Sequence, residues 1–326
     1  MLSRELEETL RRAMSNAALQ SHEFATLEHL LMALTEDSDA MEVLHACDVD
    51  IKELVKKLIE FIEVDLASIV NANGDDGYAP LAIERGIPAL AKAASEFGIA
   101  VMTLTHTHHF AALWPEVEAL AEQNLAGMAC VSYMPNVAPH GSNKPLFGTN
   151  PLAFAWPRKN KPPFVFDMAT SAMAGGDIAI AARDGHSVPL GTGLDENGNE
   201  TTDPAAILKG VMLPFGGHKG SAIATMVELL AAGATGERFS FEAQDADNGD
   251  GGPPRGGEFF LAFSPSLLAG EGWEDHCEKF FDKYEAIPGS RLPGARRHNN
   301  RNDTTNRAVD AKLIATIQEL CSRPDS

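Results

Sequence analysis

The first part of the chain has apolar residues at the spacing of amphipathic helices. Over residues 2–66 they recur every three or four positions, with Leu6, Leu10 and Met14 on one face. Thr26 is placed to cap a second run, and Asp50 and Glu53 have the spacing of a capping box before the clearest one. The pattern predicts a small all-α unit of four short helices joined by polar connections.

The pattern changes near residue 71, where Asn71, Asn73, Gly74 and Gly77 cluster in a turn-rich stretch. We interpret residues 71–80 as a linker between a helical unit (1–70) and a second domain (81–326). In that domain we expect strands at 99–104, 128–133, 152–156, 164–168 and 259–263, and helices at 90–97, 111–123, 169–182, 221–232, 273–286 and 309–320. Residues 244–257 are expected to form a polar surface loop. The fold class is therefore α+β, or mixed.

Composition excludes several classes of partner. The chain has 326 residues and a formal net charge of −20, which argues against binding to nucleic acid or to an anionic membrane. Four scattered cysteines without a C-x-x-C pair favour a reducing cytoplasm. We find no export signal and no apolar run of the length needed to span a membrane.

A glycine-rich turn precedes the apolar run 222–232. Gly216, Gly217 and Gly220 allow a tight turn, and a helix beginning here would direct its free N–H groups and dipole toward an anion beside His218 and Lys219. We interpret the turn as a phosphate or carboxylate site. The equally weighted alternative is that the glycines only shape a strand-to-helix turn and that Lys219 is a solvated charge.

A second candidate stretch contains His106, His108 and His109, between a predicted strand and a predicted helix. Such junctions often carry ligands in α/β proteins, so we expect a loop that faces a cofactor. A zinc site is a weaker alternative because no matched acidic ligand is nearby. The other alternative is that the histidines only mark the N-terminus of a helix that is capped by polar residues.

Three further segments carry polar groups in suggestive places. Thr149 lies in a rigid turn suited to orienting a carbonyl or carboxylate, and Asp167 and Asp177 follow a predicted strand. Asp167 serves equally well as a helix cap. The basic turn 291–297 suggests a dedicated anion such as the 2′-phosphate of NADP, with solvated surface as the alternative reading.

The N-terminal segments resemble a known helical repeat. The stretches are MLSRELEETL at 1–10, HEFATLEHLLMAL at 22–34 and VLHACDVD at 43–50. They resemble the first repeat of the N-terminal domain of ClpA-type Clp ATPases, which receives adaptors and substrates. This resemblance implies a possible Clp adaptor as partner of residues 1–70. The chain has no G-x-x-x-x-G-K-[ST] loop of an ATP motor.

The remaining segments resemble a second family. The stretches are HHFAALWP at 108–115, KPLFGTNP at 144–151, FDMATSAM at 166–173, LPFGGHKG at 213–220 and RLPGARR at 291–297. In order and spacing they resemble the malate/L-lactate dehydrogenase-like NAD(P)H reductases, nearest to the Δ1-piperideine-2-carboxylate/Δ1-pyrroline-2-carboxylate reductases, over about residues 81–320. The resemblance implies a non-Rossmann mixed sheet, a homodimer and reduction of a cyclic imine carboxylate or a 2-oxo acid.

The resemblance also assigns roles to residues. It implies that Thr149 binds the substrate and that Asp177 is the carboxylate end of a proton relay. The implied contacts to NADP(H), favoured over NAD(H), are His109, Phe110, Ala111, Ala112, Leu113, Asp167, Met168, Ala169, His218, Lys219, Arg291, Leu292, Pro293, Gly294, Ala295, Arg296 and Arg297. We expect His218 and Lys219 to lie near the Arg296 loop. No metal is expected.

The chain departs from the second family at its proton donor. That family carries a Ser-His-Gly segment near the N-terminus, whereas the only Ser-His pair before residue 81 is Ser21 with His22, inside the Clp-like part. Gly175 stands where near relatives tend to carry histidine. We therefore expect a chimaeric reductase, without its usual N-terminal helices, that turns over weakly or not at all. The alternatives are a Clp-type binding module on a non-catalytic body, or a recombined chain without function.

Overall fold

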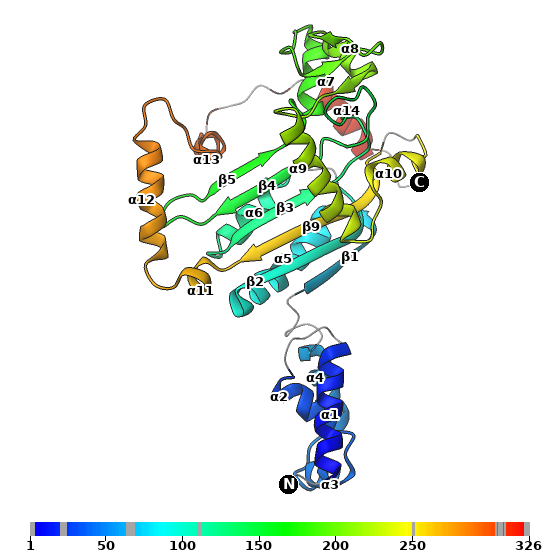
Figure 1. Ribbon diagram of the computed structural model, residues 1–326, viewed down its shortest axis with the longest axis vertical. Helices are drawn as coiled ribbons and strands as arrows, with labels where there is room; N and C mark the ends of the chain where they lie inside the picture. Colours follow the sequence, from blue (N-terminus) through cyan, green and yellow to red (C-terminus); the bar gives the residue numbers. More distant parts are fainter. Residues whose placement is uncertain are drawn as a thin grey trace.

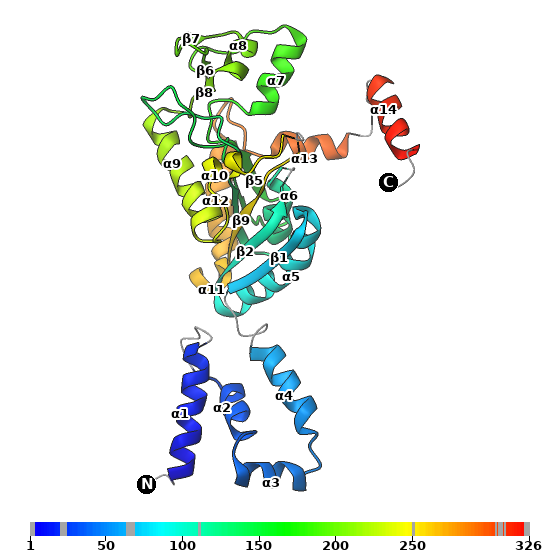
Figure 2. The same cartoon turned by 90° about the vertical axis from the view of Figure 1, so that its right-hand side faces the viewer.

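The computed structural model describes residues 4–19, 25–62, 69–109, 112–249, 252–303, 305, 309 and 311–322. Helices α1 to α4 form a unit at one end, called here the helical unit (residues 4–62). A sheet flanked by helices forms the body (69–303), and a smaller lobe built from α7, α8 and β6 to β8 stands on top of it (Figures 1 and 2).

The helical unit contains α1 (Arg4–Leu19), α2 (Leu27–Leu34), α3 (Ser38–Ala46) and α4 (Ile51–Glu60). These agree with the predicted helices. The Asp50 carboxylate accepts from the Glu53 N–H at 3.1 Å, so the expected cap of α4 is present. At the start of α2, the Thr26 N–H donates to His29 Nδ1 at 3.2 Å, and His29 is buried by this arrangement.

The larger sheet has the order β1-β2-β9-β3-β4-β5. Its strands are β1 (Ile69–Tyr78), β2 (Ile99–His108), β9 (Arg255–Phe263), β3 (Ala126–Val131), β4 (Leu152–Trp156) and β5 (Phe164–Met168). Only the β1 and β2 pair is parallel among these described strands, and the other neighbours are antiparallel. The sheet is therefore mixed and mainly antiparallel, as the sequence predicts.

Helices cover both faces of this sheet. On one face, α5 (Ala79–Phe97) packs on β1 and β2, and α6 (Trp114–Ala121) packs on β3, β4 and β5. On the other face lie α9 (His218–Glu228) and the turn of π-helix η2 (Leu229–Gly233), as Figure 2 shows. Between sheet and first helix layer, Leu90, Met102 and Phe260 are fully buried in the main core.

The smaller lobe has its own core. It consists of α7 (Gly175–Asp184), β6 (Gly193–Leu194), β7 (Glu200–Thr201), α8 (Pro204–Lys209) and β8 (Val211–Met212). Ile178, Ile207 and Met212 are buried together there. A Cβ at Gly193 would lie 2.4 Å from Ile207, so only glycine allows α8 to approach this sheet.

The remaining helices border the body. They are α10 (Ser240–Asp245), α11 (Pro265–Ala269), α12 (Trp273–Glu285), α13 (Ala295–Asn302) and α14 (Ala311–Ser322). Arg158, beside β4, holds α12 through Glu278 at 2.9 Å and Glu285 at 2.9 Å and stacks 4.4 Å from the Phe281 ring centre. Every described side chain of α14 is exposed.

The predicted linker at 71–80 is wrong, because residues 69–78 form β1 and pair with β2. The turn-forming residues are absorbed in an irregularity between Asn73 and Gly77, where Asp75 and Asp76 have positive φ. Gly74 is needed there, since a Cβ would lie 2.0 Å from the Thr107 side chain. Turn-rich composition did not prevent an edge strand, which needs partners on one side only.

Other predicted bounds also shift. The helix expected at 169–182 begins only at Gly175, because Ser171 bridges to Pro214 and the chain before α7 is extended. The predicted surface loop 244–257 ends where β9 begins at Arg255. The short elements β6, β7, β8, α8, α10, α11 and α13 were not predicted.

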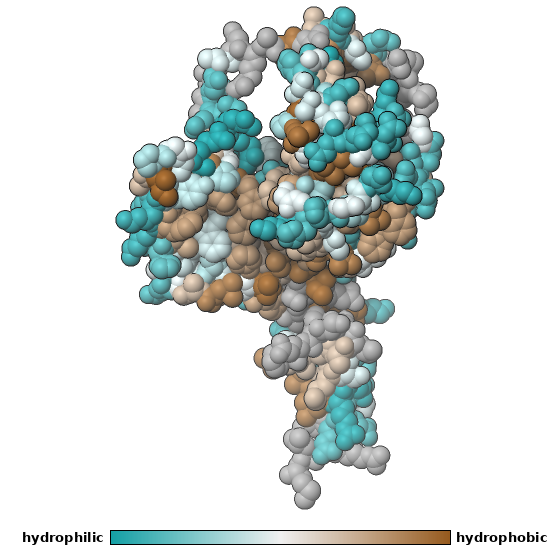
Figure 3. Space-filling view, turned by 45° about the horizontal axis from the view of Figure 1, so that its top comes forward, coloured by the Kyte–Doolittle hydropathy of each residue, from teal (hydrophilic) through white to brown (hydrophobic). Residues whose placement is uncertain are grey.

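Apolar surface gathers at the end of the body that faces the helical unit. Phe97, Ile99, Leu267 and Leu268 are exposed there, at the end of α5, the start of β2 and in α11. Figure 3 shows this region as brown surface low on the body. Among the described residues, no helix combines the length and apolar character required to cross a membrane.

Candidate functional site

A cleft of about 660 Å³ separates the sheet from the smaller lobe and is called here the candidate cleft. From the body it is lined by His109, Val131, Tyr133, Asn136, Thr149 and Pro151, and from the lobe by Ala174, Gly175, Gly176, Ile207, Leu208, Gly210 and Met212. A largely apolar cleft with a few polar groups between two lobes is a common ligand site. The structure thus brings together Thr149 and His109, two residues selected from the sequence.

The turn that carries Thr149 is held from both sides. The Gly148 N–H donates to Ser240 Oγ at 3.1 Å, and Asn150 Nδ2 donates to Glu228 Oε1 at 2.8 Å. Asn150 is fully buried with φ of 38°, a strained conformation that its hydrogen bonds maintain. Because Glu228 also accepts from Ser240 N–H at 3.0 Å, one buried carboxylate joins α9 to this turn.

His109 lies at the end of β2 beside a buried acidic cluster. Its Nδ1 is 2.9 Å from Glu258 Oε2, with 10% of the His109 side chain and 0% of the Glu258 side chain exposed. The two groups form an ion pair when the imidazole is protonated. Burial, with the charge of Glu258, raises the pKa of the neighbouring Glu116 to about 7. Burial likewise raises the pKa of Cys130 to about 12.

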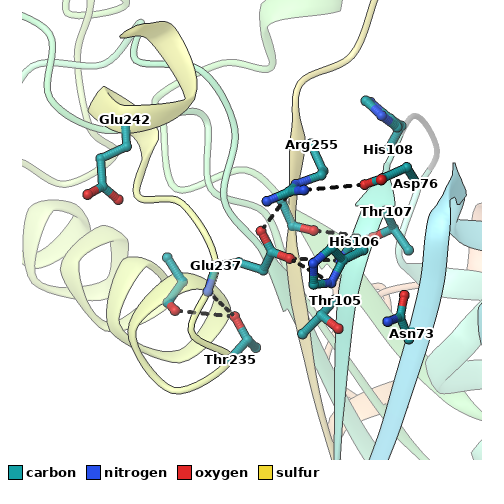
Figure 4. A network of polar contacts seen from close by, with 12 residues as sticks. Asn73, Asp76, Thr105, His106, Thr107, His108, Thr235, Glu237, Glu242 and Arg255 are labelled. Atoms are coloured by element: carbon teal, nitrogen blue, oxygen red, sulfur yellow. Dashed lines mark hydrogen bonds and ion pairs between the residues drawn. The ribbon is translucent and has the colours of Figure 1, made fainter. Parts of the chain in front are cut away.

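The three clustered histidines occupy different surroundings. His106 lies 3.4 Å from Glu237, whose carboxylate also accepts from the His106 N–H at 2.8 Å. His108 Nδ1 is 2.8 Å from the Pro253 carbonyl oxygen, and Figure 4 shows its ring apart from the His106 network. Among the described residues, no group of three or more His, Cys, Asp and Glu side chains is placed to hold a metal ion.

Asp167 caps the helix that follows the histidines. Its Oδ2 accepts from the N–H groups of Leu113 and Trp114 at 2.8 and 3.0 Å, so Asp167 caps α6 and not the helix predicted directly after it in the sequence. Met168 and Ala169 continue from the same strand end. Asp167 and the backbone of the buried Leu113 are therefore in contact at the start of α6, and the cofactor contacts that the resemblance implies for them stay a prediction.

Arg297 extends this surface. Its guanidinium lies 4.5 Å from the Trp114 ring centre, and its buried Nε and Nη2 have no hydrogen-bond partner in the described chain. Burial lowers the pKa of Arg297. Nearby Arg301 is paired with Glu118, with one contact of 2.9 Å. Guanidinium nitrogens without a protein partner beside a helix N-terminus fit an anionic ligand.

A second hollow of about 320 Å³ is lined by Arg291, Leu292, Pro293 and Ala295 of the basic turn, with Arg158 and His298 among the other lining residues. Arg291 and Arg296 are exposed, while Leu292 is buried and Pro293, Gly294 and Ala295 are partly buried. Gly294 has φ of 84°, and a Cβ there would lie 2.8 Å from the Val165 carbonyl oxygen. Glycine thus lets the turn pack against β5.

His218 and Lys219 begin α9, as the sequence predicts. Gly217, the N-cap, has φ of 62°, and a Cβ at Gly220 would lie 2.1 Å from the Phe215 carbonyl oxygen. The His218 ring lies 6.1 Å from that of His140. However, α9 and the Trp114-bearing α6 lie on opposite faces of the sheet (Figure 2). Within one chain, the described contacts therefore do not link His218 and Lys219 to the basic turn 291–297, although from the sequence we expected them to lie near the Arg296 loop.

Asp177 lies in the first turn of α7 and is exposed. Its neighbours Gly175 and Gly176 line the candidate cleft, and a Cβ at Gly175 would meet Thr149 at 3.8 Å. His22, Phe110 and Ala111 lie outside the described residues. The relay implied for Asp177 remains a prediction.

Sequence reasoning missed Glu116, Glu228 and Glu258. Each is a glutamate with at most 7% of its surface exposed. The sequence did contain a signal, which is a charged residue inside an otherwise apolar run, such as Glu258 in β9. Since glutamate is rarely buried without a partner, such a residue indicates a buried polar contact. Such a signal marks a position and does not reveal the partner.

Comparison with known proteins agrees with the fold. Residues 1–85 match the Clp repeat (R) N-terminal domain, and residues 55–318 match the malate/L-lactate dehydrogenase family, starting earlier than the residue 81 expected from motifs. A Δ1-pyrroline-2-carboxylate reductase of Ancylobacter novellus is 43% identical over 78% of this chain and 76% of its own length. One of Pseudomonas fluorescens is 48% identical over 70% and 69%.

A solved structure shows the same likeness. The Δ1-piperideine-2-carboxylate reductase of Pseudomonas syringae superposes with a TM-score of 0.73 and 42% identity, covering 77% of each chain. The mixed sheet, the cleft between sheet and lobe and the extent of these matches lead to one conclusion. From residue 55 to residue 318, this chain belongs to the malate/L-lactate dehydrogenase family.

Proposed function

We propose that the chain is an NADPH-dependent reductase of a cyclic imine 2-carboxylate, of the Δ1-piperideine or Δ1-pyrroline kind, or of a related 2-oxo acid. The observation that carries this proposal is the candidate cleft, where Thr149 and His109 meet between sheet and lobe. Relatives named as such reductases support it.

In this proposal Thr149 orients the substrate carboxylate. Its turn is kept rigid by Glu228 and Ser240, so the hydroxyl is held in place before the substrate arrives. A bound NADPH would supply the hydride. The region around Asp167 and Arg297 fits that cofactor, because Arg297 has buried nitrogens without a protein partner.

The preference for NADPH over NADH rests on the arginines at 291, 296 and 297. Guanidinium groups match a phosphate better than a ribose hydroxyl. Replacing Arg296 and Arg291 with glutamine should raise the Kd for NADPH and leave that for NADH almost unchanged. Equal effects on both cofactors would remove this part of the proposal.

We expect lower turnover than in the relatives, since the Ser-His-Gly segment is absent and a missing general acid costs roughly 10² to 10⁴ in rate. The test is NADPH oxidation with Δ1-piperideine-2-carboxylate, beside an intact relative. A comparable rate would contradict the expected impairment. Absence of NADPH binding in the folded chain would end the reductase proposal.

The competing function is a Clp-type binding module carried by residues 1–70, with the rest of the chain passive. The match to the Clp repeat and the exposed Met14, Leu27 and Val43 favour it. Pull-down with the Clp adaptor tests it, and capture lost on replacing Leu27 with serine would support it. If the chain is instead a product of recombination, an independent DNA sequence across codons 66–81 will differ.

We also propose a cytoplasmic homodimer formed through the body, which lacks the N-terminal helices usual in its relatives. The exposed apolar end of the body near Phe97 and Leu268 supports burial against a partner. Sedimentation of the full chain measures the mass, and a monomer would contradict this assembly.

A further inference from the structure

The candidate cleft contains a possible replacement for the missing acid. Among the described residues that line it, His109 and Tyr133 have side chains that titrate. An ordinary tyrosine gives up its proton only near pH 10, whereas an ordinary imidazolium does so near pH 6.5. Imidazole is therefore the better proton donor at neutral pH.

A buried carboxylate lies directly beside the His109 ring. Glu258 on β9 lies 2.9 Å from Nδ1, and its side chain is fully buried, so water screens the pair poorly. The other groups facing this cluster are Glu116 on α6, Asp167 on β5 and the Cys130 thiol on β3. The raised pKa values of Cys130 and Glu116 keep the thiol and, in part, the Glu116 carboxyl uncharged, so Glu258 is the carboxylate in direct contact with the imidazole.

Position separates His109 from the other histidines of its segment. His106 faces Glu237 on the far side of β2, and His108 contacts Pro253 beside a different hollow. Only His109 of these described residues lines the cleft that contains Thr149. A substrate oriented by Thr149 would therefore have this imidazole in the same cleft.

We propose that His109, held by Glu258, is the general acid of this chain, a role that rests on the reductase function proposed above. A bound NADPH would supply a hydride to the imine carbon and leave as NADP⁺. The carbon–nitrogen π pair would then move to nitrogen, the imidazolium of His109 would give its proton to that nitrogen to complete a secondary amine, and neutral His109 would recover a proton from solvent. Glu258 is a positioning residue that does not touch the substrate.

The experiment compares His109→Gln, Glu258→Gln and the matched control His108→Gln in the full chain. We expect His109→Gln to lower kcat, measured at saturating NADPH, about 10²-fold, and added imidazole to restore part of the rate to His109→Ala. Glu258→Gln should move the fall of kcat/KM with rising pH to lower pH. His108→Gln should behave as the unmodified chain.

A second readout needs no turnover. In the free chain with labelled histidine, the ring signals of His109 should titrate at higher pH than in Glu258→Gln. Unchanged kcat in His109→Gln, or loss of the pH-dependent limb in Tyr133→Phe instead, would overturn the assignment. A chain that binds NADPH but never oxidises it would also overturn it, whereas a chain that binds no NADPH refutes the reductase proposal itself.

Discussion

The helical unit and the body bury different kinds of side chain. In the described part of the helical unit, the buried side chains are Thr9, Ala13, Ala17, His29, Ala33, Leu58 and Ile62. In the body, Leu90, Met102 and Phe260 are fully buried in one continuous cluster. Because stabilisation follows apolar area removed from water, about 25 cal/mol per Å², the body should be much the more stable of the two. One chain thus joins a body of higher expected stability to a helical unit of lower expected stability.

The largest difference between the helical unit and the body should appear in their native-state hydrogen-exchange rates. Amides of β2 and β9 should open only with global unfolding, whereas amides of α2 and α3 should exchange by local opening, on the order of 10³-fold faster or more. Mass spectrometry of peptic fragments measures both in one sample. Equal protection in the two regions would show that the helical unit is stabilised by contacts beyond those described.

Core truncation should act on the two regions unequally. Phe260→Ala should lower the free energy of unfolding of the body by roughly 4 kcal/mol, since the ring is fully buried in the main core and β9, which carries it, is paired on both sides by β2 and β3. Leu58→Ala should melt only α4 and its neighbours. Unfolding followed by circular dichroism should show two separate transitions, one for each region. A single shared transition would show that the body and the helical unit do not differ in stability as expected.

The acidic cluster should make the body more stable at lower pH. Glu116 has a pKa near 4.5 when unfolded and about 7 in the fold, so the folded state binds more protons between these values and stability falls as pH rises through them. Glu116→Gln should raise the free energy of unfolding at pH 8 by about 3 kcal/mol and flatten this slope. Urea titrations at pH 5 and pH 8 test it.

The ion pair on α12 should act in the opposite direction. Hydrogen bonds from Arg158 lower the pKa of Glu278 from 4.5 to about 2, so its stabilisation is present above pH 4.5 and lost as the pH falls toward 2. Glu278→Gln should cost about 2 kcal/mol at pH 7 after allowance for solvent screening. The exposed Asp282→Asn is the control and should cost almost nothing.

The smallest effect belongs to the helical unit. Asp50→Ala removes the acceptor for the Glu53 N–H and should destabilise α4 by about 1 kcal/mol. The loss should lower helical content of this unit without changing the melting of the body. A matched drop in the body transition would show that the two regions unfold together.

Sequence patterns predicted what depends on local spacing. The helices at 27–34 and 51–60 and the strands at 152–156 and 164–168 are present because periodicity and caps act within a few residues. The strand at 69–78 was missed because its stability comes from pairing with β2, which no local pattern of Asn, Asp and Gly reveals. The short strands of the smaller lobe were not predicted from the sequence for the same reason.

The site was predictable to a similar degree. Thr149, His109 and the start of α9 were selected from motifs, and the structure brings the first two into one cleft. The acidic partners were not selected, since Glu258 is distant from His109 in sequence and meets it only through a side-chain contact that β2 and β9 make possible as neighbouring strands. The separation of Lys219 from the arginine turn likewise follows from which face of the sheet each helix covers.

The position of β1 has a mechanical consequence. The helical unit is tethered to the body at Ile69, the first residue of a strand that pairs with β2 alone in the described sheet. Tension applied through the N-terminal helices is therefore transmitted first to the hydrogen bonds between β1 and β2. An unfolding machine that pulled from this terminus would peel away β1 and expose β2 before disturbing the strands that line the cleft.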